Sequence, residues 1–396
     1  MNSSRHLLCL YPWLKLGGAD KFNLDMLGQL RRRGWRATVV TTLPATHSWR
    51  AAFEPVCDQI IDIATTPPAE HPARLVQIIE VSRPDCALIS HSSLGYAALP
   101  YLRAHYPELP FADYCHIEEP YWRDGGYPRM SLAQAAGLDL QIVSSDHLKA
   151  WMTERGGEPA RIEVCSTNID TADWNPARYD RARLRAEIGL PSDAHVVLYA
   201  ARLERQKQPM LAARVIRAAI AGSARLHVLI AGDGLFGPYL QSYVRRHGLE
   251  GRARLLGAVS GERMRELLAI SDVFFLPSLH EGISLAIYEA MAMGVAPVSA
   301  NVGGQAELLT PECGVLIARG RDEQAAYTRA LCQLAAEPAR TRAMGEAARR
   351  RVTQHFPLDA MGRRMDDLLG LAIRRHADLP RAPAGREAAR ASALAA

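Results

Sequence analysis

The chain has 396 residues, a length that exceeds one ordinary core and fits two domains of about 150–200 residues each. Its 48% hydrophobic and 22% charged residues, with a formal net charge of +5, are typical of a folded globular protein. No uninterrupted apolar stretch approaches the roughly 18 residues that a membrane span needs, so the sequence predicts none.

The basic residues are almost all arginines, since only four of the 47 Lys and Arg residues are lysines. The two basic clusters, Arg31–Arg33 and Arg349–Arg351, have no interleaved aromatic side chains that could stack on bases. We therefore expect no nucleic acid partner and interpret both clusters as solvated helix faces. One alternative is left open: Arg31–Arg33, with Arg36, could contact anionic lipid headgroups at the inner membrane.

The seven cysteines are scattered along the chain and include no Cys-x-x-Cys pair. Their odd number and spacing argue against a disulfide framework and against a structural zinc site. A reducing, cytoplasmic location is the simplest expectation, with peripheral contact at the inner membrane left open.

The first half of the chain alternates short apolar runs with amphipathic stretches, the βα pattern of a parallel sheet. Apolar residues at helical spacing predict a helix over Asp20–Gly34, ended by its glycine. The expected strands are His6–Tyr11, Ala37–Thr41, Cys86–Ser90, Phe111–His116, Gln141–Ser144 and Arg161–Cys165.

After a proline-bearing stretch with a short charged helix, Asp180–Ile188, the βα pattern starts again. The expected strands are Val196–Ala200, Leu226–Ala231, Val273–Leu276 and Ala296–Ala300. The expected helices are Met210–Ala219, Gly237–His247, Ser284–Met293, Glu323–Ala335 and Pro338–His355. Two successive α/β halves predict two Rossmann-like, doubly wound parallel-sheet domains facing across a cleft. The expected boundaries are 1–172, a linker at 173–192, 193–377, and an aperiodic, disordered tail at 378–396.

The segment His280–Gly294 is the densest in chemistry-bearing residues. Because it follows a strand and ends in Gly294, a helix is expected to begin near Ser284, a good N-cap residue. Backbone N–H groups at Ile283–Leu285 would then point out of the helix N-terminus and bind a phosphate. Glu281 and Glu289 would flank that anion, which suits a ligand with hydroxyls at both ends. The plainer alternative is one solvated and one helix-capping glutamate.

A second segment, Leu198–Pro209, carries Arg202 to the end of an expected strand and places Lys207 five residues later. Open α/β sheets bind ligands at this edge, and two cations there can neutralise a diphosphate leaving group. Ordinary surface charges are the alternative. No Asp-x-Asp pair occurs in the chain, so we expect no metal and no other cofactor at the diphosphate.

The first of these segments resembles the E-x7-E signature of the retaining glycosyltransferase family 4, and the resemblance extends over nearly the whole chain. It implies the GT-B fold, contact of Glu281 with the transferred sugar, and contact of Glu289 with the ribose. Gly282, Ile283, Ser284 and Leu285 would bind the donor phosphates, although many family members have glycine where Ser284 stands. Arg202 and Lys207 resemble the family's G-R-L-x4-K diphosphate clamp, with Ala201 in place of the usual glycine.

Further motifs follow in the family's order. Gly17, Gly18 and Asp20 resemble its glycine-rich loop near donor phosphate and acceptor, with aspartate where glutamate is more usual. His116 resembles its strand-end histidine near the donor sugar. Weaker matches are Asn168-Ile169-Asp170 at the end of the first domain, Gly232-Asp233-Gly234 beside the nucleotide, and Gly303-Gly304-Gln305-Ala306-Glu307. Taken singly, a tight glycine turn and a structural histidine explain these residues equally well.

The resemblance implies metal-independent, retaining transfer of a hexosyl-type sugar from a nucleotide diphosphate sugar to an acceptor hydroxyl. Synthesis of a bacterial surface polysaccharide or glycolipid is the expected setting. The acceptor would be a glycan, a lipid-linked saccharide or a small molecule. Three alternatives stay open: a sugar-nucleotide epimerase, a pyridoxal-phosphate phosphorylase, and a catalytically silent nucleotide-sugar-binding subunit.

Overall fold

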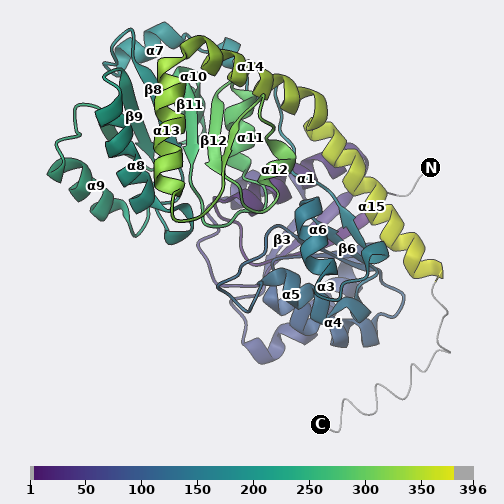
Figure 1. Cartoon of the computed structure of the whole chain (residues 1–396). Helices are drawn as coiled ribbons and strands as arrows, with labels where there is room; N and C mark the ends of the chain where they lie inside the picture. The colour runs from purple at the N-terminus through teal and green to yellow at the C-terminus, as the bar shows by residue number, and fades with distance from the viewer. Residues whose placement is uncertain (1–3, 379–396) are drawn as a thin grey trace. The chain divides into compact units, whose positions relative to one another are not determined.

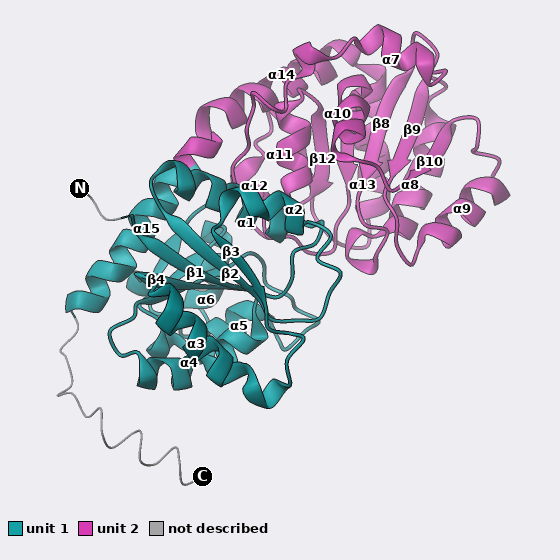
Figure 2. Ribbon diagram, turned by 180° about the vertical axis from the view of Figure 1, so that it is seen from behind, with its two compact units in different colours: residues 1–165, 361–396 teal, residues 166–360 magenta. Residues whose placement is uncertain are grey.

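The computed structural model describes residues 4–378, and the chain divides into two compact units. The first unit comprises residues 1–165 together with 361–396, and the second comprises residues 166–360 (Figure 2). The tail predicted at 378–396 lies, apart from Asp378, outside the described residues. The domain boundaries expected from the sequence stay a prediction.

A seven-stranded, wholly parallel sheet forms the centre of the first unit, in the order β3-β2-β1-β4-β5-β6-β7. Two of its strands, β3 and β6, are labelled in Figure 1. All six residues of β1 are buried, as expected where helices cover both faces of a parallel sheet. The strands are β1 (His6–Tyr11), β2 (Arg36–Thr41), β3 (Gln59–Asp62), β4 (Cys86–Ser90), β5 (Phe111–Cys115), β6 (Leu140–Val143) and β7 (Ile162–Val164).

The α-helices of the first unit connect these strands, and the last one returns to the unit from the end of the chain. They are α1 (Gly18–Arg32), α2 (Arg50–Phe53), α3 (His71–Ser82), α4 (Ser93–His105), α5 (Tyr127–Ala133), α6 (Asp146–Thr153) and most of α15 (Leu358–Asp378). On α15, Asp366 accepts a hydrogen bond from Trp35 Nε1 (2.8 Å), and Gly362 packs so closely on α1 that a Cβ would lie 2.6 Å from Gln29.

The second unit repeats the architecture with a six-stranded parallel sheet in the order β10-β9-β8-β11-β12-β13. Alternate residues of β8 enter two cores on opposite faces of the sheet. Val196 and Leu198 face one core, while Val197 and Tyr199 face the other. The strands are β8 (His195–Ala200), β9 (Leu226–Ala231), β10 (Ala253–Gly257), β11 (Val273–Leu276), β12 (Ala296–Ala300) and β13 (Val315–Ile317).

Helices cover both of these faces. They are α7 (Arg181–Glu187), α8 (Pro209–Gly222), α9 (Gly237–Arg246), α10 (Gly261–Ile270), α11 (Leu285–Ala292), α12 (Gln305–Leu308), α13 (Glu323–Ala336) and α14 (Pro338–His355). The stretch expected to be a linker packs within this unit, since Trp174, Leu184 and Leu190 are buried in one of its cores. Arg181 and Arg185 of α7 also form ion pairs with Asp272 (2.6 and 2.7 Å).

The prediction of two Rossmann-like parallel-sheet domains is confirmed, and β1, β4, β9, β11 and β12 have the predicted bounds. The strands missed from the sequence, β3, β10 and β13, are short and only partly buried, so they lack a continuous apolar run. Within residues 4–378, no helix is both long and apolar enough to cross a membrane. All seven cysteines are unpaired.

Candidate active site

The loops that follow β8, β9, β11 and β12 meet at the carboxyl edge of the second unit's sheet. The strand order reverses between β8 and β11, and open α/β sheets bind ligands at this switch point. The segments that carry Arg202 and Glu281 leave the sheet from these two strands. The fold therefore brings both sequence motifs to the position where a ligand is expected.

Lys207 and Glu281 form an ion pair at this edge. Lys207 ends a 3-10 turn, η6 (Arg205–Lys207), and Glu281 lies in the loop before α11. Two hydrogen bonds join the loops: Leu279 N donates to Gln206 O (2.7 Å), and Gln206 Nε2 donates to His280 O (3.0 Å). The lysine amine and the glutamate carboxylate are therefore held together by the backbone as well as by charge.

Arg202 differs from Lys207 in being solvent-exposed. Its guanidinium makes no hydrogen bond or ion pair with any residue between 4 and 378. The preceding residue, Ala201, is fixed by hydrogen bonding of its N–H to Ala231 O (3.0 Å). Arg202 thus offers an uncommitted cation at the strand edge, whereas the charge of Lys207 is already compensated by Glu281.

The loop that holds Glu281 is pressed against the loop that follows β12. Gly304 N donates to Gly282 O (2.7 Å), and a Cβ on Gly303 would lie 1.8 Å from Glu281 O. Gly303 also has a φ of 54°, a left-handed conformation that favours glycine. The glycines of the Gly303–Glu307 motif thus serve to position the backbone of Glu281 and Gly282.

The N-terminus of α11 differs in part from the expectation. Ser284 occupies the N-cap position, as predicted, but its side chain makes no capping hydrogen bond. Its backbone N–H donates to Oε1 of Gln305 (3.3 Å), a fully buried residue. This amide was expected to bind a phosphate, but in the structure it already has an acceptor. Ile283 and Leu285 keep amides without an acceptor in the described part of the chain. Glu289 lies on α11 and is half-buried.

Gly232 and Asp233 support the loop that carries Arg202. Gly232 has a φ of 129°, and a Cβ there would lie 1.9 Å from Ala201 O, which only glycine avoids. Asp233 O accepts a hydrogen bond from Leu203 N (2.8 Å), while its carboxylate accepts one from Gly234 N (2.7 Å). The Gly-Asp-Gly turn thus packs closely against the backbone on both sides of Arg202.

Gly17, Gly18 and Asp20 lie at the carboxyl end of β1 in the first unit. Gly17 is the N-cap of α1 and Gly18 its first residue. Asp20 is buried, and its Oδ1 accepts a hydrogen bond from Lys15 N (3.2 Å). Asp20 therefore reaches back from the first helical turn to hold the preceding loop, as the acid of a capping box does.

His116 lies one residue past β5 and forms part of a histidine pair at the same edge of the first sheet. Its ring Nε2 is 3.2 Å from Ser90 Oγ, and its backbone N–H donates to His91 Nε2 (3.2 Å). Burial, with a contribution from His91, lowers the pKa of His116 well below its usual range. Burial also lowers the pKa of His91 to about 3. Both rings are therefore neutral near pH 7.

Sequence reasoning missed His91, which has a φ of 53° and whose ring stacks on Tyr127 (centroids 4.4 Å apart). Its position directly after a predicted strand was the available signal, the same one that selected His116. A second missed feature is the contact between His147 Nε2 and Glu118 Oε1 (2.8 Å). The buried Glu118 Oε2 has no hydrogen-bond partner within the described range.

Asn168 contacts neither the residues around Arg202 and Glu281 nor the residues around His116. Its Nδ2 donates to Pro357 O (2.8 Å), and the neighbouring Ile169 pairs with the same segment through a β-bridge. Asn168 is buried in this contact, which belongs to the second unit. Its contacts therefore join residues 168–169 to Pro357 and have a structural role.

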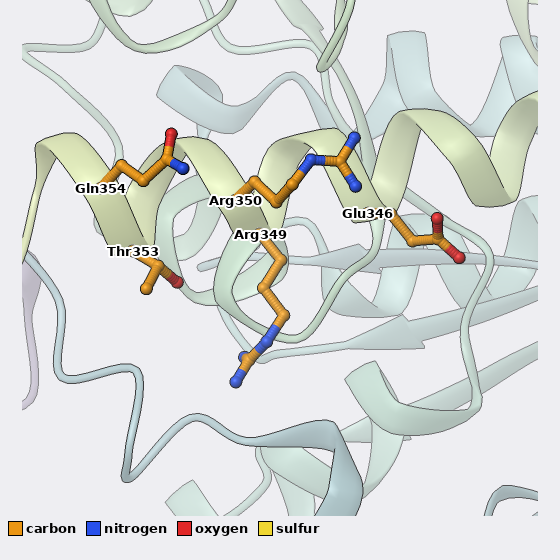
Figure 3. Close-up of a pocket in the computed structure, with 5 residues that line it drawn as sticks. All are labelled: Glu346, Arg349, Arg350, Thr353 and Gln354. Atoms are coloured by element: carbon orange, nitrogen blue, oxygen red, sulfur yellow. The ribbon is translucent and has the colours of Figure 1, made fainter.

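A cavity of about 340 Å³ lies on α14 and is shown in Figure 3. It is lined by Glu346, Arg349, Arg350, Thr353 and Gln354 and contains none of the predicted site residues. Arg349 is committed elsewhere, because it donates hydrogen bonds to Trp174 O (3.0 Å) and to Ala292 O at the end of α11. The cavity therefore adds no chemistry to the candidate site.

Solved structures share this architecture over most of their length. HepE of Anabaena, solved in complex with UDP, matches with a TM-score of 0.77 and 21% identity, covering 92% of this chain and 99% of that one. WaaG, described as a glycosyltransferase involved in lipopolysaccharide biosynthesis, matches with a TM-score of 0.69 and 15% identity, covering 92% and 99%. The fold of this chain is therefore the GT-B fold, which these structures share.

A protein-family model matches part of the second unit. The profile of "Glycosyl transferases group 1" matches residues 180–351, which include every candidate residue of the second unit after Asn168. The match covers less than half of the chain and shows that this part of the second unit is similar to the group 1 glycosyltransferases.

Two relatives show what proteins of similar sequence are named for. D-inositol 3-phosphate glycosyltransferase of Salinispora tropica is 29% identical over 62% of this chain, which spans only 55% of that relative's length. α-Maltose-1-phosphate synthase of Mycobacterium tuberculosis is 25% identical, with 87% of this chain and 93% of the relative covered.

Proposed function

We propose that this protein is a retaining, metal-independent glycosyltransferase that moves a hexosyl-type sugar from a nucleotide diphosphate sugar to an acceptor hydroxyl. The observation that carries the proposal is the Lys207–Glu281 ion pair at the switch point of the second sheet, with the exposed Arg202 nearby in sequence. The partial match to the glycosyltransferase family model and the UDP complex of HepE, which has a similar fold, support the same donor class.

Each group has a distinct role in the proposed reaction. The bond between the sugar's anomeric carbon and the diphosphate oxygen breaks, and Arg202, Lys207 and the α11 N-terminus stabilise the charge that develops on the diphosphate. The acceptor oxygen forms the new bond on the same face, and its proton passes to the departing phosphate oxygen. Glu281 holds Lys207 and accepts hydrogen bonds from the sugar's hydroxyls. Positioning and electrostatics together supply most of the lowering of the barrier.

Lys207 supports the metal-independent part of the proposal. An ammonium group that is held by Glu281 is preorganised and needs no reorientation when the diphosphate arrives. The exposed Arg202 can turn towards the phosphates and form paired hydrogen bonds with them. Arg202, the N–H donors of Lys207 and the helix N-terminus then stabilise a charge that a divalent metal neutralises in other enzymes.

The proposal is tested by sugar transfer from UDP-, GDP- and ADP-sugars in the presence of EDTA, with anomeric configuration followed by NMR. Retention of configuration, together with loss of transfer in Glu281→Ala and Arg202→Ala, would support it. Wild-type rates in either variant would refute the site, and an inverted product would refute the retaining mechanism. The same assay separates the alternatives, since an epimerase converts the donor without an acceptor and a silent subunit binds nucleotide without turnover.

Synthesis of a bacterial surface polysaccharide or glycolipid is the setting that we propose, and likeness to WaaG in fold is consistent with it. The acceptor would be a glycan, a lipid-linked saccharide or a small molecule. The arginines suggested for lipid contact are partly committed, because Arg31 and Arg36 both lie near Asp58 (3.7 and 3.6 Å). Arg32 stays exposed, so peripheral membrane contact stays a proposal.

A further inference from the structure

A second cavity, of about 170 Å³, lies at the amino edge of the second unit's sheet, where β8 begins. Its lining includes Arg181, Arg185, His195, Arg225, Asp272 and Arg342. His195 is the first residue of β8, whose other end leads to Arg202. At about 3.3 Å per residue, the cavity lies roughly 20 Å from the candidate active site along this strand. It is therefore separate from the donor site.

Two of its four arginines are fully used by the fold. Arg181 and Arg185 each donate to one carboxylate oxygen of Asp272. Arg181 also donates to the carbonyl oxygens of Ala269 and Ser271, and Arg185 donates to that of Ile270. Asp272 in turn accepts a hydrogen bond from Val196 N (2.8 Å). The Asp272 carboxylate is therefore shared by two guanidinium groups and a backbone N–H, which fixes this side of the cavity.

The other two arginines have capacity to spare. Arg225 donates from Nε to Asp193 O (2.9 Å) and lies 3.7 Å from the Asp193 carboxylate, but its two terminal nitrogens have no acceptor among residues 4–378. Arg342, exposed on α14, makes no side-chain hydrogen bond or ion pair within the same range. With Asp193 and Asp272 as the acidic residues of the lining, the four arginines leave an excess of two positive charges.

His195 supplies an independent sign that a polar ligand belongs here. The residue is only 3% exposed, and its Nε2 is buried without a hydrogen-bond partner in the described part of the chain. Buried polar atoms are nearly always satisfied, so an unpartnered one in the wall of a cavity indicates a missing partner. Burial, with the neighbouring arginines, lowers the pKa of His195, so its ring is neutral near pH 7 and can donate one N–H.

A helix N-terminus completes the lining. Pro338 lines the cavity and is the first residue of α14, which has 18 residues. The N-terminus of such a helix carries a partial positive charge, although Pro338 has no N–H to donate and the N-cap residue, Glu337, is acidic.

We propose that this cavity is a binding site for the phosphate group of a small soluble molecule, distinct from the sugar-donor site. Arg225 and Arg342 would hold the phosphate oxygens in paired, charge-assisted hydrogen bonds, and His195 Nε2 would donate to a third oxygen. The volume of about 170 Å³ has room for a phosphate and a few attached atoms, and it is smaller than most pockets for larger ligands, which are about 300–1,000 Å³. Inorganic phosphate and small phosphate monoesters are the ligands that fit.

The test is calorimetric titration of the full chain with inorganic phosphate at constant ionic strength. We expect binding by the wild type, a loss of about tenfold or more in affinity for the double variant Arg225→Ala/Arg342→Ala, and no change for Lys207→Ala. Arg340→Ala is the matched control, because Arg340 lies on the same helix but is paired with Glu337 (3.2 Å) and does not line the cavity. If the double variant fails to fold, Arg342→Ala alone replaces it.

Several results would overturn the proposal. Absence of phosphate binding by the wild type would do so, as would unchanged affinity in the double variant. Loss of binding in Lys207→Ala instead would assign the phosphate to the donor site. A parallel sedimentation assay with vesicles containing phosphatidic acid tests the other source of a phosphate monoester. Binding to these vesicles without binding of free phosphate would contradict a soluble ligand.

Discussion

Lys207 and Glu281 are 74 positions apart in the chain, yet their side chains form an ion pair in which the lysine is 15% exposed and the glutamate 7%. Removing one member of a buried pair is costly, because the other charge is left without compensation. Each member of this pair therefore affects both the stability of the protein and the charge of the donor site, and the two effects can be separated.

Lys207→Met should lower the free energy of unfolding by about 3 kcal/mol, since Glu281 then stays buried and unpaired. The double variant Lys207→Met/Glu281→Gln should recover most of this loss, because neither charge is left. Denaturant unfolding of the four proteins in this cycle measures the effect. Additive effects of the two substitutions on the free energy of unfolding would show that the pair is not coupled.

Glu281→Gln should reduce kcat by about 10²–10³-fold, because the carboxylate acts on the transferred sugar and positions Lys207. Binding of the free nucleotide diphosphate should be retained or strengthened, since Lys207 is released to the phosphates. Steady-state kinetics and calorimetry provide the two readouts. Glu346→Gln, an exposed glutamate on α14, is the control, and a parallel loss of nucleotide binding and kcat in Glu281→Gln would contradict the assigned role.

Gly303→Ala should displace the loop that carries Glu281, because the new Cβ would lie 1.8 Å from Glu281 O. We expect a large loss of transfer activity and destabilisation by about 1–3 kcal/mol, from strain at a left-handed position and the clash together. Gly248→Ala is a matched control, since Gly248 has a similar φ of 60° but open space around its Cα. If both variants lose activity equally, the close contact with Glu281 is not the cause.

Asp113 should make stability depend on pH, independently of the active site. Burial raises the pKa of this carboxyl from 3.8 to about 6, despite a hydrogen bond from Tyr96 Oη (2.7 Å). Between these two values the folded protein holds the proton more tightly than the unfolded chain, so the free energy of unfolding falls as pH rises. Asp113→Asn should therefore gain stability relative to the wild type from pH 4 to 6, by up to about 3 kcal/mol.

Thermal unfolding of both proteins between pH 4 and 8 measures this difference. Above about pH 6 the advantage of Asp113→Asn should be constant. An advantage that is largest at pH 4 would contradict the raised pKa.

Much of the fold could be predicted because buried strands of a parallel sheet are continuous apolar runs. The run Val273–Leu276 is such a case, and β11 has these bounds. In contrast, β3 ends in Asp62 and has one exposed and three half-buried residues, so its pattern did not distinguish a strand from a loop. Edge strands depend on pairing with a neighbour, and that information lies in the tertiary structure.

The sequence predicted which segments form the candidate site, but it did not predict the contacts between their residues. Arg202, Lys207 and Glu281 stood out through motif spacing, and the sheet topology places their loops at one edge. The ion pair of Lys207 with Glu281 and the occupation of Ser284 N by Gln305 both depend on loops that are distant in sequence. No local periodicity or propensity encodes which side chain of one loop reaches the backbone of another.

The most direct test of the central claim is calorimetric titration of the purified protein with UDP, GDP and ADP, with EDTA present throughout. Tight binding of one nucleotide, lost in Lys207→Ala and kept in Arg340→Ala, is the result that a metal-independent donor site predicts. Binding of none of the three, or equal binding by Lys207→Ala, would contradict it.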